Sequence, residues 1–253
     1  VVTPDGYAVN ACFPINGPHP AKMTDPSKLC PEQTNPTIGD RLDEAGISWA
    51  WYAGGWNDAV AGHPALLFQF HHQAFTYYKN YALGSPGQQA HLKDENDFIA
   101  ALQTGDLPSV IFLKALGSEN EHPGYSLLST GQQWSANMVK LIQESPIWDD
   151  CAIFISYDEN GGRWDHVAPP RIDQWGPGSR VPAIVISPYA RKGFVDHTPY
   201  DTTSILKFIE TRWNLDPLTT RDANAYDMTN AFDFSAPTEA APLTVTPAAT
   251  PGS

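Results

Sequence analysis

Basic residues are scarce in this chain of 253 residues, which has 15 Lys and Arg against 28 Asp and Glu and a formal net charge of −13. Negative charge over most of the exterior repels the phosphate backbone of nucleic acids and anionic membrane surfaces. The composition therefore excludes nucleic acid as a partner. Hydrophobic residues make up 42% of the chain, an ordinary share for a domain with a real core, so we expect order over most of it.

Long apolar runs are also absent. No stretch reaches the roughly 18 apolar residues that a transmembrane helix needs, and no charged and then apolar signal segment opens the chain. We therefore expect no transmembrane span. The first residue is Val1 rather than Met, so we interpret the chain as a product of proteolytic processing, although a trimmed fragment would begin in the same way.

Cysteine is rare, with three residues in the chain. Cys12 and Cys30 flank a Pro-rich stretch that cannot build much core, and an oxidised pair would constrain that stretch. We therefore name them as the disulfide candidate, which favours a secreted or periplasmic protein. Cys151 opens an apolar run, and we interpret it as a small buried side chain without chemistry.

Composition divides the chain into three parts. Residues 1–36 are rich in Pro and Asn without a sustained period, so they predict an extended arm or loop. Residues 37–234 contain the periodic segments and predict the folded domain. Residues 235–253 are rich in Ala, Pro and Thr and predict a flexible tail.

Helical and strand patterns alternate in the central part. Helices are expected at 37–45, 94–104, 131–144 and 201–214, and strands at 47–52, 109–113, 151–156 and 182–187. This alternation predicts an α/β fold with a mostly parallel central sheet covered by helices. The last two strands are apolar on both faces, which is typical of the middle of a parallel sheet. Ligands of such sheets bind beyond the carboxyl ends of the strands.

An acidic segment follows the third of these strands. Asp158, Glu159, Asp165 and His166 lie within nine residues of one another, beside Gly161-Gly162. Carboxylates this dense repel one another unless a cation or protons neutralise them, and oxygen ligands favour Ca²⁺ or Mg²⁺ over Zn²⁺. Asp158 and Glu159 are the first candidate ligands of one divalent cation. An acidic turn exposed to water remains the alternative.

Histidines follow two other strands or apolar runs. His71 and His72 come directly after the apolar run 66–70, and His122 lies in the polar loop after strand 109–113. Neighbouring residues of a strand face opposite ways, so one of the paired histidines needs a role outside the core. We therefore expect His71, His72 and His122 to reach the same cleft as the acidic segment.

A hard cation beside several imidazoles suits a phosphate ester. The cation would stabilise charge on a nucleophile and a phosphoryl oxygen, while protonated histidines would bind the other oxygens and assist the leaving group. Activity at acidic pH follows, because the imidazoles must be charged. Ser129 and Ser187 are available hydroxyls, but neither has a neighbouring base in the sequence, and we reject both as the nucleophile.

The whole motif 157–170, Tyr-Asp-Glu-Asn-Gly-Gly-Arg-Trp-Asp-His-Val-Ala-Pro-Pro, resembles the signature of the phosphoesterase family that holds bacterial acid phosphatases and non-haemolytic phospholipases C, within the alkaline-phosphatase-like superfamily. The resemblance covers roughly residues 37–215 and includes further matching segments at 37–42, 47–52, 71–72, 119–124 and 178–188.

The resemblance implies a helix-covered sheet and a covalent phosphoenzyme step. By similarity, Asp158 and Glu159 are metal ligands, and His71, His72 and His122 surround the bound phosphate. Asp165 and His166 could orient the metal ligands, or they could form a pair that only stabilises the loop.

The family pattern usually begins with a strand followed by a Glu-Asn metal-ligand pair, and later presents a Ser or Thr nucleophile; neither element is recognisable here. The resemblance therefore places this chain in the C-terminal half of the domain. A sheet that lost several strands would expose an edge and apolar surface, so we expect the N-terminal fragment of the same precursor to stay associated as a second chain. A truncated product is the alternative.

Three functions remain open at this point. The chain stops soon after residues 229–234, where a phospholipase C of this family generally continues into β-rich domains, so we expect an acid phosphatase acting on phosphate monoesters. A phospholipase C acting on phospholipids is the second possibility. A metal-binding module that kept the fold without the nucleophile is the third.

Overall fold

The computed structural model describes residues 12–20, 23, 25–174 and 176–235. It divides into two compact units, Val1–Ser135 and Ala136–Ser253. The tail expected from residue 235 onward lies outside the described residues except for Ser235, and so do residues 1–11, 21, 22 and 24 of the expected arm. No helix among the described residues has both the length and the apolar character needed to cross a bilayer.

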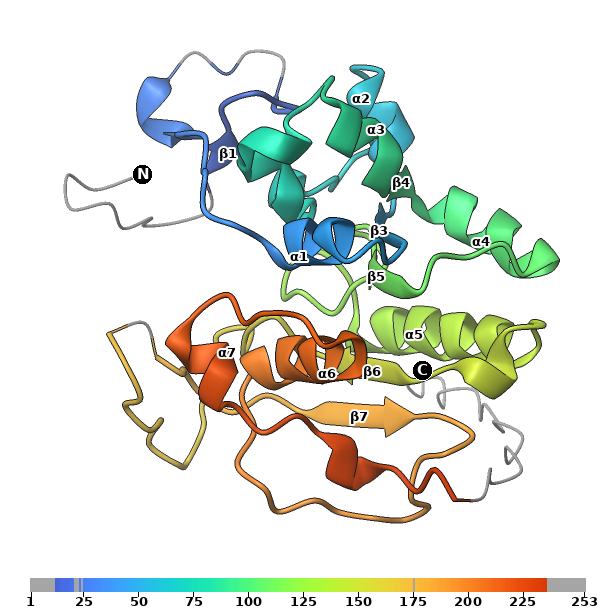
Figure 1. Cartoon of the computed structure of the whole chain (residues 1–253). Helices are drawn as coiled ribbons and strands as arrows, with labels where there is room; N and C mark the ends of the chain where they lie inside the picture. Colours follow the sequence, from blue (N-terminus) through green and yellow to red (C-terminus); the bar gives the residue numbers. More distant parts are fainter. Residues whose placement is uncertain (1–11, 21–22, 24, 175, 236–253) are drawn as a thin grey trace, which may run out of the picture. The chain divides into compact units, whose positions relative to one another are not determined.

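The first unit contains a three-stranded parallel sheet in the order β4-β3-β5 (Figure 1). Its strands are β3 (Trp49–Ala53), β4 (Leu92–Asp94) and β5 (Val110–Lys114), and its α-helices are α1 (Ile38–Glu44), α2 (Trp56–Val60), α3 (Pro86–His91) and α4 (Glu95–Thr104). Short 3-10 helices are η1 (Pro26–Lys28), η2 (Phe70–His72), η3 (Ala74–Tyr77) and η4 (Lys79–Tyr81). The α/β class and the parallel sheet predicted from the sequence are confirmed here.

Local sequence explains where these helices begin. Thr37 caps α1, and its side chain and that of Asp40 bond each other's backbone N–H groups in a capping box. Asp94 and Asp97 form the same arrangement at the start of α4. Each such cap contributes about 1 kcal/mol to helix stability. The helix starts expected near residues 37 and 94 are therefore confirmed.

An aromatic cluster forms the core below this sheet. The Trp49 ring stacks on His91 at 4.2 Å and packs against Phe75 at 4.7 Å. Trp51, on the same strand, stacks on Phe112 of β5 at 5.4 Å. The alternating side chains of β3 thus bury aromatic area on the sheet, which makes β3 its most buried strand.

The described part of the N-terminal arm packs on this unit. Its strands β1 (Phe13–Pro14) and β2 (Leu29–Cys30) pair in parallel. Phe13 makes an edge-to-face contact with Phe70 at 5.6 Å, and the Tyr77 hydroxyl donates to the carbonyl of Cys12. The arm therefore covers the segment that precedes and follows the paired histidines.

The disulfide predicted between Cys12 and Cys30 is not formed, and both residues are free thiols. The register of β1 and β2 places Pro14 opposite Cys30, so Cys12 lies two residues out of register. Burial, followed by the nearby Cys12, raises the pKa of the Cys30 thiol to about 11.

The second unit contains a two-stranded sheet, β6 (Ile153–Ser156) with β7 (Ala183–Ile186). Helix α5 (Leu128–Gln143) carries the boundary between the units, and the second unit continues with η5 (Trp148–Asp150), α6 (Thr203–Trp213), α7 (Thr220–Asn224) and η6 (Thr229–Ala231). Phe208 of α6 packs on Phe154 of β6 at 4.7 Å and on Phe232 at 5.3 Å. These three rings form the centre of the unit.

Strands β6 and β7 pair in antiparallel orientation, which corrects the expectation that both belong to the middle of a parallel sheet. A parallel pair needs a crossover connection, usually a helix, and the described residues between 156 and 183 contain no helix. Ile184 is 53% exposed, so β7 is not covered on both faces. Apolar runs of four residues do not distinguish these two kinds of strand.

Two carboxyl groups meet in the interior of the second unit. Glu210 of α6 and Asp222 of α7 are each 2% exposed. Asp222 accepts hydrogen bonds from the backbone N–H groups of Leu218 (2.6 Å) and Thr219 (2.8 Å). Burial, followed by the hydrogen bond and charge of Asp222, raises the pKa of Glu210 to about 7. Since the pKa of Asp222 is lowered, Glu210 is the carboxyl group of this pair that holds a proton more readily.

We predict that this pair makes stability fall as the pH rises. Because the folded-state pKa of Glu210 is raised above its ordinary 4.5, its contribution is complete below pH 4.5 and is lost as the pH rises through about 7. The free energy of unfolding should decrease over this window with a slope of up to about 1.4 kcal/mol per pH unit. Urea unfolding at several pH values should show this slope in the wild type and lose it in Glu210→Gln. An unchanged slope in that variant, with Glu144→Gln as the exposed control, would contradict the assignment.

Candidate functional site

The carboxyl ends of β3, β4 and β5 lie at one edge of the parallel sheet. Gly54 follows β3 at this edge, and a Cβ atom there would lie 2.8 Å from the backbone nitrogen of Leu116, so only glycine fits. Gly55 adopts a positive φ of 74°. The loops after β3 and β5 therefore meet closely at the end where ligands of α/β sheets bind.

The paired histidines lie in the 3-10 helix η2 rather than in a strand. Their ring centroids are 4.8 Å apart and the rings are nearly perpendicular. His72 is buried with 8% exposure, whereas His71 is exposed. Neighbouring residues of a strand point to opposite faces, but these histidines are not in a strand, so that reasoning does not apply to them. The two imidazoles still occupy different environments.

His122 lies in the loop after β5, as expected. Its ring stacks on Tyr125 at 4.0 Å, and its Nδ1 atom lies 2.8 Å from the carbonyl oxygen of Pro123. A carbonyl only accepts, so Nδ1 carries a proton and donates. The His122 side chain is exposed, and the stacking and hydrogen bond hold its ring in one orientation.

The loop of His122 adjoins the turn of His71 and His72. The Tyr125 hydroxyl lies 3.5 Å from Oε1 of Gln69. A Cβ atom at Gly117 would lie 2.3 Å from the carbonyl oxygen of Leu67, so the two backbones are in close contact there. The structure thus brings together the two histidine segments that the sequence predicted to converge.

Glu95 is a half-buried residue at this edge, with one carboxyl oxygen fully buried, that sequence reasoning missed. Its Oε1 atom accepts a hydrogen bond from the Trp134 indole at 3.1 Å, and its Oε2 atom is buried without a hydrogen-bond partner among the described residues. Burial raises the pKa of Glu95 to about 6, and Glu119 and Asp94 add to the rise. In the sequence it resembles any acidic residue of a helix first turn, so no local signal distinguishes it.

Asp158 and Glu159 follow β6, also as expected. Asp158 Oδ1 accepts from the backbone N–H of Glu159 at 3.0 Å, and Glu159 Oε2 accepts from that of Gly161 at 2.6 Å. Gly161 and Gly162 have positive φ values of 60° and 70°. The loop turns sharply here with both carboxylates exposed, a geometry that suits an acidic turn and equally leaves oxygens for a cation.

Asp165 anchors this loop. Its carboxylate accepts two hydrogen bonds from the Arg180 guanidinium, at 3.0 and 2.9 Å, and one from the Val167 backbone N–H at 3.0 Å. The Arg180 side chain and the N–H groups of Val167 and Arg180 hold the pKa of Asp165 well below its usual range. His166 beside it is exposed. Asp165 therefore stabilises the loop that carries Asp158 and Glu159.

The described residues contain no group of three or more His, Cys, Asp or Glu side chains placed to hold a metal ion. Asp158 and Glu159 offer hard oxygen ligands, fewer than the six to eight of a typical Ca²⁺ site. They fit a divalent cation as part of a ligand set. Ser187, rejected above as the nucleophile, donates to the Cys151 carbonyl at 2.7 Å and accepts from the Tyr189 N–H at 3.1 Å, a structural role.

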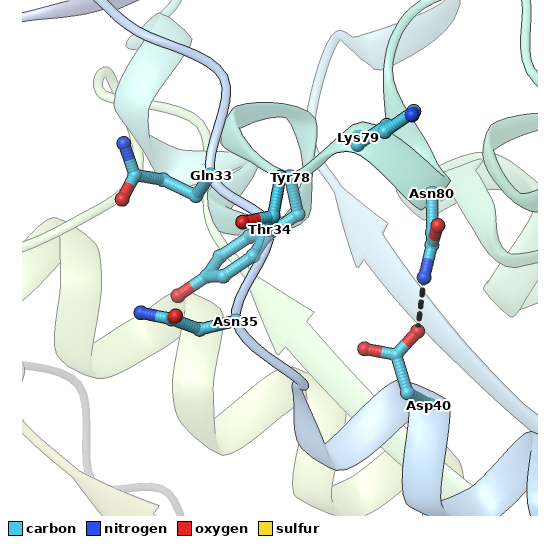
Figure 2. A pocket seen from close by; sticks show the side chains of 7 residues that line it. All are labelled: Gln33, Thr34, Asn35, Asp40, Tyr78, Lys79 and Asn80. Carbon is cyan, nitrogen blue, oxygen red and sulfur yellow. Dashed lines mark hydrogen bonds between the residues drawn. The ribbon is translucent and has the colours of Figure 1, made fainter.

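An open polar pocket lies in the first unit (Figure 2). It encloses about 250 Å³, including open solvent, and its lining consists of Gln33, Thr34, Asn35, Asp40, Tyr78, Lys79 and Asn80. None of the predicted site residues lines it. The Asn80 side-chain amide donates to Asp40 (Figure 2), and the two atoms lie 2.7 Å apart. The carboxylate of the pocket is therefore already bonded to another residue of the pocket lining.

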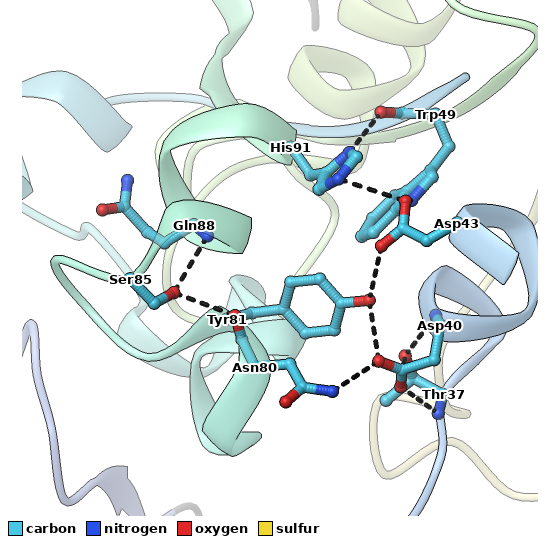
Figure 3. Close-up of polar contacts among 9 residues, drawn as sticks. All are labelled: Thr37, Asp40, Asp43, Trp49, Asn80, Tyr81, Ser85, Gln88 and His91. Carbon is cyan, nitrogen blue, oxygen red and sulfur yellow. Dashed lines mark hydrogen bonds and ion pairs between the residues drawn. The ribbon is translucent and has the colours of Figure 1, made fainter. Parts of the chain in front are cut away.

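Asp40 belongs to a network that holds the first unit together (Figure 3). The Tyr81 hydroxyl lies 3.1 Å from Asp40 and 3.4 Å from Asp43, and His91 bonds both Asp43 and the Trp49 carbonyl. Burial raises the pKa of Tyr81, and the two aspartates support the rise. The network ties α1, η4, α3 and β3 together, which gives Asp40 a structural role.

A model of the Phosphoesterase family matches residues 7–216. The chain belongs to this family. Among curated proteins it is similar to phospholipase C B of Mycobacterium tuberculosis, with 31% identity over 230 residues that cover 78% of this chain and 43% of the relative. It is also similar to a non-hemolytic phospholipase C of Burkholderia pseudomallei, with 32% identity over 248 residues, 79% of this chain and 33% of the relative.

Similarity extends to a plant protein, the non-specific phospholipase C6 of Arabidopsis thaliana, with 31% identity over 142 residues, 46% of this chain and 27% of the relative. The chain spans less than half the length of all three relatives. The family assignment agrees with the resemblance carried by the acidic motif and the histidine segments.

We predict that the Arg180–Asp165 pair controls the order of the acidic loop in this chain. Arg180→Ala should increase hydrogen–deuterium exchange across residues 157–170, because two side-chain donors to Asp165 are lost. Arg180→Lys should also increase it, since an ammonium group does not reproduce the two-point contact. Arg171→Ala, in the same loop, serves as the control. Exchange equal to the wild type in both Arg180 variants would show that the pair does not order the loop.

Proposed function

We propose that this chain forms part of a metal-dependent hydrolase of phosphate esters. The observation that carries the proposal is the meeting of the His122 loop with the His71-His72 turn at the carboxyl edge of a parallel sheet, in a chain of the Phosphoesterase family. Imidazoles gathered at such an edge suit an anionic ligand when they are protonated.

In this proposal His71, His72 and His122 bind the oxygens of the phosphate group. Protonated imidazoles donate hydrogen bonds to these oxygens, and one of them gives its proton to the leaving group. The fixed orientation of the His122 ring, with Nδ1 bonded to Pro123, supports a role for its other nitrogen in binding phosphate. Because these histidines must be charged, we expect activity to be highest at acidic pH.

Asp158 and Glu159 would hold one divalent cation, Ca²⁺ or Mg²⁺ rather than Zn²⁺, together with ligands from outside the described residues. When bound, the cation supplies charge stabilisation to a phosphoryl oxygen and to the nucleophile. Asp165 and His166 would orient this loop. The hydrogen bonds that Asp165 accepts from Arg180 support this role for Asp165.

The nucleophile of a phosphoenzyme step would come from another segment of the family domain, which we propose to be the N-terminal fragment of the same precursor, held as a second chain. The chain's span of 43% and 33% of two relatives supports a larger functional unit. Mass spectrometry of the native and denatured protein tests this arrangement. We also propose a secreted or periplasmic location, a prediction that detection in the culture medium or the periplasmic fraction would test.

Two ester classes compete as the substrate. The sequence favours a phosphate monoester and an acid phosphatase, whereas the three similar proteins named above are phospholipases C, which favours a phospholipid. Turnover of p-nitrophenyl phosphate and of phosphatidylcholine vesicles by the same preparation separates the two. A preparation that binds the cation and contains the partner chain yet turns over neither substrate would favour the non-catalytic metal-binding module.

We predict that removing either acidic ligand abolishes activity and metal binding together. Asp158→Asn and Glu159→Gln each take away a negative charge from the cation site, which costs several kcal/mol of transition-state stabilisation. The checks are metal content after dialysis and turnover at saturating substrate. Asp149→Asn, an exposed acidic residue outside the loop, is the control. Retained turnover in well-folded Asp158→Asn protein would remove this site from the mechanism.

His122→Ala should weaken phosphate binding more than metal binding. A charge-assisted hydrogen bond contributes about 1.5–3 kcal/mol, so the affinity for inorganic phosphate or vanadate should fall about 10- to 100-fold. Titration calorimetry with phosphate and with Ca²⁺ on the same protein measures both. His197→Ala, an exposed histidine of the second unit, is the matched control. Unchanged phosphate affinity in His122→Ala would contradict the role.

A further inference from the structure

Glu95 has a position that neither the family motif nor the proposed mechanism uses. It is the first residue of α4 and directly follows Asp94, the last residue of β4 (Figure 1). Helix α4 thus begins at the same sheet edge as the histidine loops. Oε1 of Glu95 is held by the Trp134 indole at 3.1 Å, and Oε2 is buried. One carboxyl oxygen of Glu95 is therefore held by a hydrogen bond, whereas the other has no hydrogen-bond partner among the described residues.

The buried oxygen faces the junction of the other two strand ends. A Cβ atom at Gly54, which follows β3, would lie 3.2 Å from Oε2 of Glu95 and 2.8 Å from the nitrogen of Leu116, which follows β5. Leu116 begins a turn. The backbone N–H of Glu119 closes this turn by donating to the carbonyl oxygen of Leu116 at 2.8 Å. The same loop continues to His122. Glu95 consequently lies beneath the base of the His122 loop.

The charges around Glu95 favour its protonated, uncharged state. Its neighbours with negative charge are Glu119 from the loop after β5 and Asp94 from the end of β4. Asp94 is 2% exposed and accepts from the N–H groups of Asn57 and Asn96, each at 3.0 Å. Trp134 of α5 contributes one uncharged donor. An ionised Glu95 would have one hydrogen bond for a buried charge beside two carboxylates, which is unfavourable.

We propose that Glu95 is a positioning residue for the His122 loop: uncharged, it lets residues 115–121 close over it, and ionised, it drives the loop that carries Glu119 away. Only the consequence for phosphate binding rests on the proposed function, since it passes through His122. The pKa of Glu95 is raised to about 6. Burial favours the uncharged form, so the closed loop is complete at acidic pH and is lost as the pH rises through about 6.

Nitrogen-15 NMR on the 253-residue chain tests this without turnover or metal. The indole N–H of Trp134, assigned with Trp134→Phe, and the backbone amides of Leu116 and Glu119 are followed from pH 4.5 to 8. All three should titrate together with a midpoint near 6. In the uncharged Glu95→Gln variant, this common transition should disappear from all three, whereas Glu44→Gln, an exposed glutamate of α1, should leave it unchanged.

Two results would overturn the proposal. No transition of the Trp134 indole between pH 4.5 and 8 would show that Glu95 does not change charge there. A transition of the indole alone, with Leu116 and Glu119 unmoved, would show that Glu95 titrates without positioning the loop. Glu119→Gln tests the same point if Glu95→Gln does not fold: the midpoint should shift to lower pH because a repelling charge is gone, and an unchanged midpoint counts against the coupling.

A failure of the proposed function leaves these readouts intact. Loss of phosphate affinity in His122→Ala reports on the histidines, whereas the common midpoint reports on Glu95. A loop that titrates normally in a protein that binds no phosphate would refute the function and keep the positioning role.

Discussion

The hydrogen bonds of the buried Asp94 carboxylate are the interaction on which the sheet edge of the first unit depends. The carboxylate accepts hydrogen bonds from the backbone of Asn57, at the start of α2, and from the backbone and side chain of Asn96, in α4. One carboxylate at the end of β4 therefore fixes the turn after β3 and the start of the next helix. A polar group buried this deeply is tolerated because it accepts several hydrogen bonds, two of them from backbone N–H groups at helix N-termini that otherwise lack partners.

The candidate site follows from that constraint. With the strand ends held in place, Gly54 and Gly117 allow backbones to approach more closely than any side chain would permit, and the loops of His71, His72 and His122 come together above the sheet. The acidic loop of the second unit is also held by hydrogen bonds to carboxylates. Its carboxylates bond the backbone N–H groups of its own turn, and Asp165 is held by Arg180. The histidine loops of the first unit and the acidic loop of the second are thus each ordered by contacts within their own unit.

Much of the fold was predictable because its signals are local. The capping residues Thr37 and Asp94, and the short apolar strands, lie next to the elements they define, so the sequence places them within a few residues. The orientation of β7 and the disulfide between Cys12 and Cys30 were wrong for the opposite reason. Both depend on the register between segments far apart in the chain, and neither composition nor periodicity contains that information.

The sequence by itself determined the α/β class and the family. It also named the candidate residues for the chemistry, Asp158, Glu159 and the three histidines, because residue type and spacing indicate ligand chemistry directly. Only the tertiary structure decided that the two histidine segments touch through Tyr125 and Gln69. It also decided that Arg180 donates to Asp165 and that one carboxyl oxygen of Glu95 is buried. The physical reason is that burial and contact belong to the surroundings of a side chain. Glu95 and the exposed Glu44 are both glutamates, and only their surroundings in the folded protein distinguish them.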